Sequence, residues 1–361
     1  MRDATYTVLA TDCLRSVAAI NGLSDRLRGQ RIAVTGGFGF VGTWIATTVA
    51  ALNERFQADI RLNLLGREPQ KWRQAQPGLN RADILCRAVD VRASFEFDRD
   101  TTLVIHAAGI ADPRVQASAP QRVYQSTLFG LDNALSAAHR LENIQRFVHM
   151  GSGQVGGQGA SSARRETEVG ALDFRRLHHL YAETHRAAEA IANSFASQYR
   201  LPVTTVRPFT FLGPFQSLDA PWAVNNFIRD ALAGHEIRVH GQGSSLRSYL
   251  YGSDAAAWLL QCALAGRDGA VYNIGGATPI SHLQTASLVS EMTHPAPAVD
   301  VRSNVTDDSR SQDFYPDITA ITADLGVYAT VDVKTAIGRT LHWHAEALGE
   351  MRRLRQAELP A

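Results

Sequence analysis

Cysteine is scarce in this sequence, and its spacing argues against a disulfide framework or a metal site. Only Cys13, Cys86 and Cys262 occur among the 361 residues. They are far apart, odd in number and form no CxxC pair. We therefore interpret them as reduced thiols that act as small buried apolar side chains, which favours a cytoplasmic protein.

Long apolar runs and an excess of one charge are also missing. The longest apolar candidate, AAAWLLQCALAG at residues 255–266, is shorter than the roughly 20 residues of a membrane-spanning helix. The N-terminus has no basic region followed by an apolar stretch, so we expect no secretory signal. Basic and acidic residues balance at 36 against 35. This balance argues against nucleic acid or a membrane surface as a partner.

What the sequence does contain is a regular alternation of strand and helix patterns. Residues 1–29 form a helical extension to which we assign no function. Short apolar strands then alternate with amphipathic helices; the strands are expected at 31–37, 60–66, 84–91, 103–109, 146–152 and 202–208. Such alternation predicts an α/β fold with a doubly wound, Rossmann-like parallel sheet. We assign residues 30–208 to this dinucleotide-binding domain.

The alternation weakens after residue 208. Turn formers in FTFLGPFQSLDAP are followed by a helix, a short strand and a mixed remainder. We expect residues 209–361 to be mainly a smaller α/β lobe that binds the substrate at the ligand edge of the sheet. Residues 252–275 are expected to pack back on the first domain.

A glycine-rich loop follows the first predicted strand. In TGGFGFVG, Gly36, Gly39 and Gly42 stand between a strand and a helix that opens with Phe40 and Val41. Such glycines allow a sharp turn and a close approach to a pyrophosphate, which the helix N-terminus attracts. We therefore predict dinucleotide binding here, rather than a merely tight turn.

The residues that would meet the adenosine end leave NAD and NADP both open. Gly66 occupies the position where an acidic residue would bind a ribose, and Arg67 follows it. An arginine can bind a 2′-phosphate, which tilts the choice mildly toward NADP. Asp90 and Val91 stand where a side chain could meet the adenine, although a simple strand-end turn is equally compatible.

Five motifs occur in a specific order: TGGFGFVG, HAAG, Tyr181 with His185, RPFTFLGP and LRSYLYGSDAA. With these motifs, residues 30 to 290 resemble the extended short-chain dehydrogenases/reductases, and more narrowly the NAD-dependent epimerase/dehydratase family that acts on nucleotide sugars. The resemblance implies a nucleotide-sugar substrate. It also implies a homodimer through the helices near residues 120–140 and 181–199. Further cofactor contacts are implied at Ala107, Ala108, Gly109, Tyr181, His185 and Pro208.

The resemblance assigns the chemistry to three residues. Ser152 matches the family residue that hydrogen-bonds the reacting sugar oxygen, and Tyr181 matches its acid-base residue. His185 stands where the family has a lysine that binds the nicotinamide ribose and lowers the pKa of the tyrosine. A neutral imidazole provides little of that electrostatic help, so the rate is expected to fall unless another cation assists.

A second departure bears on the type of reaction. The 4,6-dehydratases of this family carry an Asp-Glu pair after the catalytic residue, where this sequence has Gly153 and Gln154. Dehydration is therefore disfavoured unless Glu166 or Glu168 reaches the site. Hydride transfer at C4, in an epimerase or keto-reductase, is the preferred hypothesis, and a dehydratase is the alternative.

The substrate contacts implied by the resemblance come from both lobes. Arg247 matches the arginine that binds the substrate diphosphate, and Asn226 is placed to donate to a phosphate. Ser152 and Gln154 are expected to contact the sugar. No metal site is expected, because the adjacent His178 and His179 have no partner at ligand spacing.

A different class of function is a cofactor-binding sensor or scaffold without turnover. Such a protein would keep the glycine loop but would not need Ser152, Tyr181 and Arg247 together. Their joint presence favours an enzyme.

Overall fold

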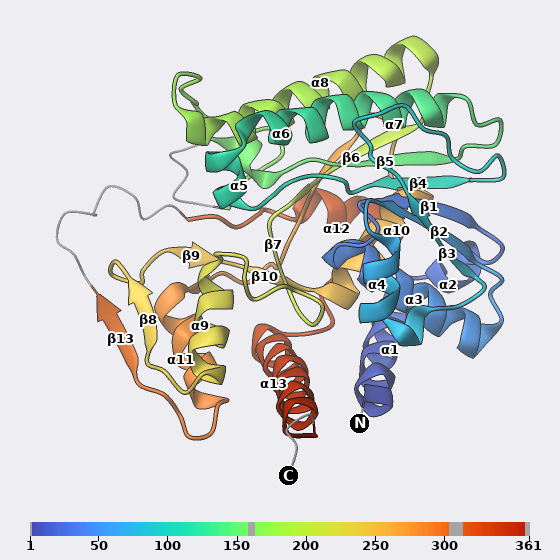
Figure 1. Ribbon diagram of the computed structural model, residues 1–361. Helices are drawn as coiled ribbons and strands as arrows, with labels where there is room; N and C mark the ends of the chain where they lie inside the picture. Colours follow the sequence, from blue (N-terminus) through green and yellow to red (C-terminus); the bar gives the residue numbers. More distant parts are fainter. Residues whose placement is uncertain (1, 158–162, 303–312, 358–361) are drawn as a thin grey trace.

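A seven-stranded parallel sheet forms the centre of the molecule (Figure 1). The computed structural model describes residues 2–157, 163–302 and 313–357. The strand order is β11-β6-β5-β4-β1-β2-β3. These strands are β1 Arg31–Thr35, β2 Arg61–Gly66, β3 Ile84–Ala88, β4 Leu103–His106, β5 Arg146–Met150, β6 Val203–Pro208 and β11 Val271–Ile274. The order reverses beside β1, so ligands are expected beyond the carboxyl ends there, and the predicted Rossmann-like α/β fold is confirmed.

Helices cover both faces of this sheet (Figure 1). One layer packs α1, α3 and α10 against each other, and the other contains α6, α7 and α8. The bounds are α1 Arg2–Ala18, α2 Leu23–Leu27, α3 Phe40–Phe56, α4 Pro69–Ala75, α5 Pro113–Ser118, α6 Pro120–Tyr124, α7 Gly130–His139, α8 Leu180–Tyr199, α10 Gly252–Ala265 and α12 Thr319–Leu325. Short 3-10 turns are η1 Pro77–Leu79, η3 Gly153–Gly156 and η4 Leu177–His179, and η2 Gln125–Phe129 is a π turn. The two layers bury separate apolar clusters against the sheet.

The N-terminal residues are part of the core. The expected helical pattern is two helices, broken at Gly22 where φ is 67°. Leu9 and Cys13 of α1 are fully buried, and α1 packs on α3 and α10. Nε of Arg339 lies 2.9 Å from a carboxylate oxygen of the buried Asp12. This helix therefore adds a structural layer rather than a loose extension.

The second lobe consists of short strands and helices beside the carboxyl edge of the sheet (Figure 1). Its elements are β7 Thr210–Leu212, α9 Ala223–Leu232, β8 Ile237–His240, β9 Leu246–Arg247, β10 Tyr249–Tyr251, β12 Ile280–Ser281, α11 His282–Glu291, β13 Val299–Arg302 and α13 Val333–Ala357. β13 pairs with β8 in parallel, and α9 and α11 pack on them. Within the described ranges, no helix combines the length and apolar character needed to cross a bilayer.

Candidate active site

The glycine loop between β1 and α3 has the close packing that a dinucleotide site requires. Gly36 has a φ of 67°, and a Cβ atom there would lie 2.6 Å from the carbonyl oxygen of Ala107. A Cβ atom on Gly42 would lie 2.2 Å from the carbonyl oxygen of Gly37. Gly39 precedes α3 without a side-chain cap. The first amide groups of α3 are therefore available to an anion such as a pyrophosphate.

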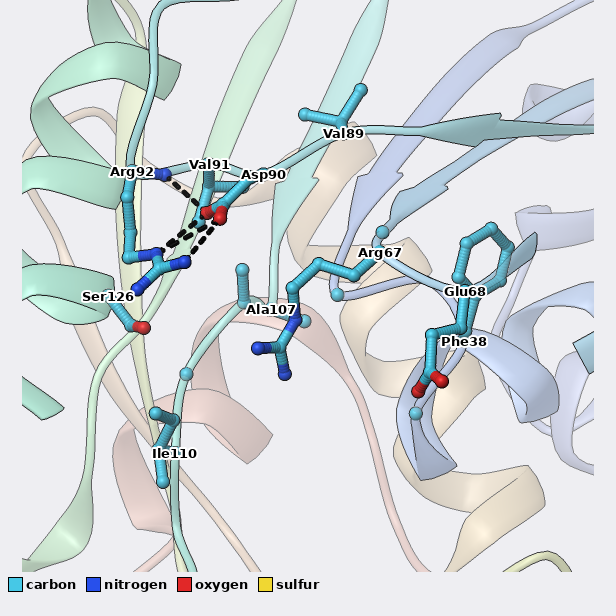
Figure 2. A pocket seen from close by; sticks show the side chains of 15 residues that line it. Phe38, Arg67, Glu68, Val89, Asp90, Val91, Arg92, Ala107, Ile110 and Ser126 are labelled. Carbon is cyan, nitrogen blue, oxygen red and sulfur yellow. Dashed lines mark hydrogen bonds and ion pairs between the residues drawn. The ribbon is translucent and has the colours of Figure 1, made fainter. Parts of the chain in front are cut away.

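A cavity of about 310 Å³ opens beside this loop, at the ends of β2, β3 and β4 (Figure 2). The predicted cofactor residues that line it are Gly36, Gly39, Arg67, Asp90, Val91, Ala107, Ala108 and Gly109. Phe40, Val41, Gly42 and Pro208 are not among its lining residues; the first three lie in the first turn of α3, and Pro208 ends β6. The residues present fit the adenosine half of a dinucleotide.

The charged side chains in this cavity differ in whether they are hydrogen-bonded to a neighbour. Asp90 accepts hydrogen bonds from Nε of Arg92 at 2.9 Å and from its Nη2 at 2.5 Å, which lowers the pKa of Asp90 to about 2. Arg67 has no hydrogen bond or ion pair with any described residue and extends into the cavity (Figure 2). Arg92 was not predicted as a site residue, although its position two residues after Asp90 was a usable signal for their pairing. The same Asp-x-Arg spacing pairs Asp112 with Arg114.

The three predicted catalytic residues lie together. Ser152 follows β5 and caps the η3 turn by accepting a hydrogen bond from the amide of Gln154 at 3.2 Å. Ser152 lies close enough to Tyr181 that its side chain lowers the pKa of the phenol. His185 lies one turn further along α8, and its ring centroid is 4.5 Å from that of Tyr181. Nδ1 of His185 is buried and has no hydrogen-bond partner among the described residues.

Position 185 provides no positive charge to Tyr181 at neutral pH. Burial raises the pKa of Tyr181, and Ser152 acts in the opposite direction. Burial lowers the pKa of His185 to about 4, so its imidazole is neutral at pH 7. The electrostatic help expected from a family lysine is therefore not supplied by His185.

Two further histidines, which the sequence analysis did not single out, lie near His185. His106 ends β4 and His149 lies in β5, with their ring centroids 6.3 Å apart. Nδ1 of His106 is 2.8 Å from Oγ1 of Thr35, whereas both ring nitrogens of the buried His149 lack a partner among the described residues. Burial lowers the pKa of both. No three metal-ligating side chains are grouped suitably for an ion in the described part of the chain.

A buried ion pair holds α8 against the sheet. Nε and Nη2 of Arg207, in β6, donate to the two carboxylate oxygens of Glu189 at 2.8 and 2.7 Å. Nη1 of Arg207 donates to the carbonyl oxygen of Glu166 at 2.7 Å. The pair therefore also fixes the chain segment that follows the catalytic strand.

Glu166 and Glu168, whose carboxylates could have restored a dehydratase site, are placed elsewhere in the structure. Glu166 accepts a hydrogen bond from the amide of Asn273 at 2.9 Å, and Glu168 is exposed. A Cβ atom on Gly153 would lie 2.7 Å from the ring of Phe209, so that position has no room for an acidic side chain. Gln154 is exposed.

Arg247 and Asn226 lie in the second lobe. Nη1 of Arg247 donates to the carbonyl oxygen of Leu246 at 2.8 Å, and its guanidinium lies 5.9 Å from the ring centroid of Phe314. Burial lowers the pKa of Arg247. Oδ1 of Asn226 accepts a hydrogen bond from Nη2 of Arg229 at 2.7 Å.

The fold, the glycine loop and the Ser152–Tyr181 pair together define a dinucleotide-dependent enzyme of the Rossmann class. Residues 32–275 match the NAD dependent epimerase/dehydratase family, and the chain belongs to this family. The predicted family and the prediction of an NAD-type enzyme that modifies nucleotide sugars are confirmed.

The relatives include several activities. The chain is 26% identical over 299 residues to UDP-glucuronic acid decarboxylase 3 of Arabidopsis thaliana, covering 82% of this chain and 84% of the relative. It is 25% identical over 330 residues to dTDP-D-glucose 4,6-dehydratase of Bos taurus, covering 88% and 89%. Both relatives extend across most of the chain, so the similarity includes the second lobe.

Solved structures show the same fold. The Bordetella bronchiseptica enzyme WbmF in complex with NAD⁺ and UDP matches with a TM-score of 0.75 at 18% identity, covering 92% of this chain and 97% of that one. The UDP-N-acetylglucosamine 4-epimerase of Methanobrevibacter ruminantium matches with a TM-score of 0.76 at 20% identity, covering 89% and 99%.

The neutral state of His185 leads to a testable prediction. Replacing His185 by Lys places a cation beside the Tyr181 phenol and favours its ionised form, so the Tyr181 pKa should fall by about one unit or more. An ultraviolet titration of tyrosinate can measure this, with a His185→Lys/Tyr181→Phe variant as the reference. The exposed His178→Lys variant is the matched control and should leave the Tyr181 titration unchanged. An unmoved titration in His185→Lys would contradict electrostatic coupling between these positions.

Proposed function

We propose that this protein transfers a hydride at C4 of a nucleotide-linked sugar, as an epimerase or keto-reductase. The observation that carries the proposal is the proximity of Ser152 and Tyr181 beside positions 153 and 154, whose residues are uncharged. In the reductive direction, protonated Tyr181 donates its proton to the C4 oxygen, and in the oxidative direction its ionised form accepts the proton of the C4 hydroxyl while Ser152 holds the oxygen. The nicotinamide supplies the hydride acceptor when it is bound.

The dehydratase alternative ranks below this one. Loss of water requires an acid for the leaving hydroxyl and a base at the neighbouring carbon. Phe209 occupies the space beside Gly153, and the carboxylate of Glu166 is bonded to Asn273. Oxidation or reduction at C4 alone needs neither this additional acid nor this additional base.

Mass spectrometry can test the reaction directly. The purified protein is incubated with UDP-, dTDP-, GDP- and CDP-sugars, with NAD and NADP supplied separately. We expect a product of unchanged mass and altered retention, or one that gains or loses two hydrogens. Tyr181→Phe should lower turnover by about 100-fold or more while leaving cofactor binding intact, because it removes the proton acceptor. Tyr199→Phe, at the exposed end of the same helix, should behave as wild type.

Each result has a distinct meaning for the proposal. Loss of water from the sugar would replace it with the dehydratase reaction. Undiminished turnover in Tyr181→Phe would exclude the role of Tyr181. Cofactor binding without turnover of any nucleotide sugar would favour a sensor or scaffold.

For the cofactor, we propose a preference for NADP over NAD. Three features support it: Gly66 has no carboxylate for a ribose, Arg67 lines the cavity and makes no hydrogen bond with a described residue, and the Arg92 guanidinium lies in the same cavity. A 2′-phosphate would neutralise the charge of Arg67 through charge-assisted hydrogen bonds.

The preference can be measured by cofactor titration. Arg67→Ala should weaken NADPH binding by about 10- to 100-fold, because a hydrogen bond to a charged group contributes roughly 1.5–3 kcal/mol. NADH binding should change by less than about threefold. Arg61→Ala, at the exposed opposite end of β2, is the control. Equal weakening of NADPH and NADH binding would mean that Arg67 contacts a part of the molecule that both cofactors have in common.

We also propose a homodimer through the layer of α7 and α8. Phe129 and Tyr199 are 50% and 41% exposed on this layer, and α7 and α8 pack side by side (Figure 1). Exposed aromatic side chains on adjacent helices are typical of an association surface.

Light scattering can test this surface. We expect a dimer for the wild type and a shift toward monomer for Phe129→Asp, since a charge in an apolar interface opposes association. Val8→Asp introduces the same charge at an exposed position of α1, in the opposite layer, and should remain a dimer. A monomeric wild type would contradict the proposal.

A further inference from the structure

The N-terminal helix α1 contacts both lobes of the molecule. It lies outside the segment that matches the family, which begins at residue 32. One side of α1 packs on α3 and α10 of the dinucleotide-binding domain. Other residues of α1 contact α13, the C-terminal helix of the second lobe, which lies beside it (Figure 1). The helix is therefore placed where it can hold the two lobes together.

Tyr6 of α1 belongs to an aromatic cluster that crosses from one lobe to the other. Its ring lies edge-on to that of Trp343 in α13, with 5.8 Å between the centroids, and 6.4 Å from the ring of Phe215. Phe215 follows β7 and lies 4.8 Å from Trp343 and 5.2 Å from Trp44 of α3. Such distances are those of favourable aromatic pairs. The cluster joins α1, α3, α13 and the chain that leads into the second lobe.

The same cluster reaches the helix that opens at the glycine loop. Phe40, the first residue of α3, lies 6.4 Å from Trp44 and stacks on Phe211 of β7 at 6.3 Å. Nε1 of Trp44 donates to the carbonyl oxygen of Pro214 at 3.0 Å. The entry to the second lobe is therefore seated on the helix whose N-terminal end faces the cofactor cavity.

A buried carboxylate links α1 to the start of α13. Asp254, in the first turn of α10, is fully buried. Its Oδ1 accepts hydrogen bonds from Oγ of Ser16 and from Oγ1 of Thr330, each at 2.7 Å. Its Oδ2 accepts from the amides of Thr330 at 2.9 Å and Val331 at 3.1 Å. This carboxylate ties α1, α10 and the residues just before α13 to one point.

A second buried carboxylate joins α1 to α13 directly. Asp12 is fully buried, and its Oδ2 lies 2.9 Å from Nε of Arg339 in α13. The hydroxyl of Tyr251, in β10, donates to the same oxygen at 3.3 Å. Separating the lobes would leave this buried charge without its cation, which is strongly unfavourable.

We propose that α1 positions the second lobe, so that the proposed phosphate contact Arg247 stays aligned with the cofactor cavity. This inference rests on the proposed function for the ligand that the second lobe holds. The aromatic cluster and the two carboxylates carry it, because all three connect α1 with α13 or with the chain that enters the second lobe. Tyr6, Asp12 and Ser16 do not line the cavity. They are positioning residues, which act through other side chains rather than on a ligand.

The experiment compares wild type with Tyr6→Ala, which removes the α1 member of the aromatic cluster. Hydrogen exchange read by mass spectrometry should become about 10-fold faster or more at residues 211–216 and 333–346, while β1, β2 and β4 keep wild-type protection. The dissociation constants of NADPH and of UDP, dTDP, GDP or CDP, whichever wild type binds, should change by less than about threefold, since each site lies within one lobe. Turnover of the nucleotide sugar that wild type converts should fall about 10-fold or more, because the sugar is no longer aligned with the nicotinamide.

Two further variants separate positioning from general stability. Val8→Ala is the matched control, because Val8 is 40% exposed on the same helix, and it should behave as wild type. Tyr6→Phe keeps the ring and loses only the hydrogen bond from the hydroxyl to Gln76, so it should restore the exchange pattern and the turnover.

Each outcome decides the role of α1. Unchanged exchange at residues 333–346 in Tyr6→Ala, or faster exchange there with wild-type turnover, would overturn the proposal. Faster exchange throughout the first domain together with weaker NADPH binding would also overturn it, because α1 would then stabilise the whole fold. A wild type that converts no nucleotide sugar would instead refute the proposed function, and the exchange pattern would still decide whether α1 holds the second lobe.

Discussion

The buried ion pair between Glu189 and Arg207 is the constraint on which the active site depends. It fixes α8, which carries Tyr181 and His185, against β6, and the remaining guanidinium nitrogen fixes the carbonyl oxygen of Glu166. Removal of one partner from such a pair leaves an unpaired buried charge and typically costs about 3–5 kcal/mol. Helix α8 and the segment around Glu166 therefore share one anchor, and loss of this anchor would disturb both.

Local patterns were sufficient for much of the fold, because strand and helix periodicity and the glycine loop depend on neighbouring residues. The sheet and the helix beginning at Leu180 follow from these patterns. They did not show that α1 joins the core, because an amphipathic helix does not specify the surface that covers it. The predicted helix near residues 120–140 is interrupted by a π turn at Gln125–Phe129, which no local residue pattern indicates.

The site was predictable where chemistry follows chain order and not where it depends on distant contacts. Ser152 and Tyr181 were assigned by the family resemblance, which rests on motifs in a specific chain order, and they lie close together in the structure. The contact between α1 and α13 could not be recognised, because the two helices stand at opposite ends of the chain. The substitution of His185 for lysine fits a wider feature of the composition, since Lys71 and Lys334 are the only lysines in the chain. The basic residues at the other predicted ligand-binding positions, Arg67 and Arg247, are arginines, which cannot lose their charge on burial as lysine can.

The contact between Phe38 and Gly66 has a consequence for how cofactor choice can change. A Cβ atom at position 66 would lie 2.6 Å from Cδ2 of Phe38, and the Phe38 ring packs on Trp72 at a centroid distance of 5.8 Å. An acidic residue at position 66 is therefore sterically coupled to Phe38, which lines the cavity, and through it to Trp72. Mutational paths toward a carboxylate here are epistatic, because the Phe38 ring has to shift or be replaced to make room for the new side chain.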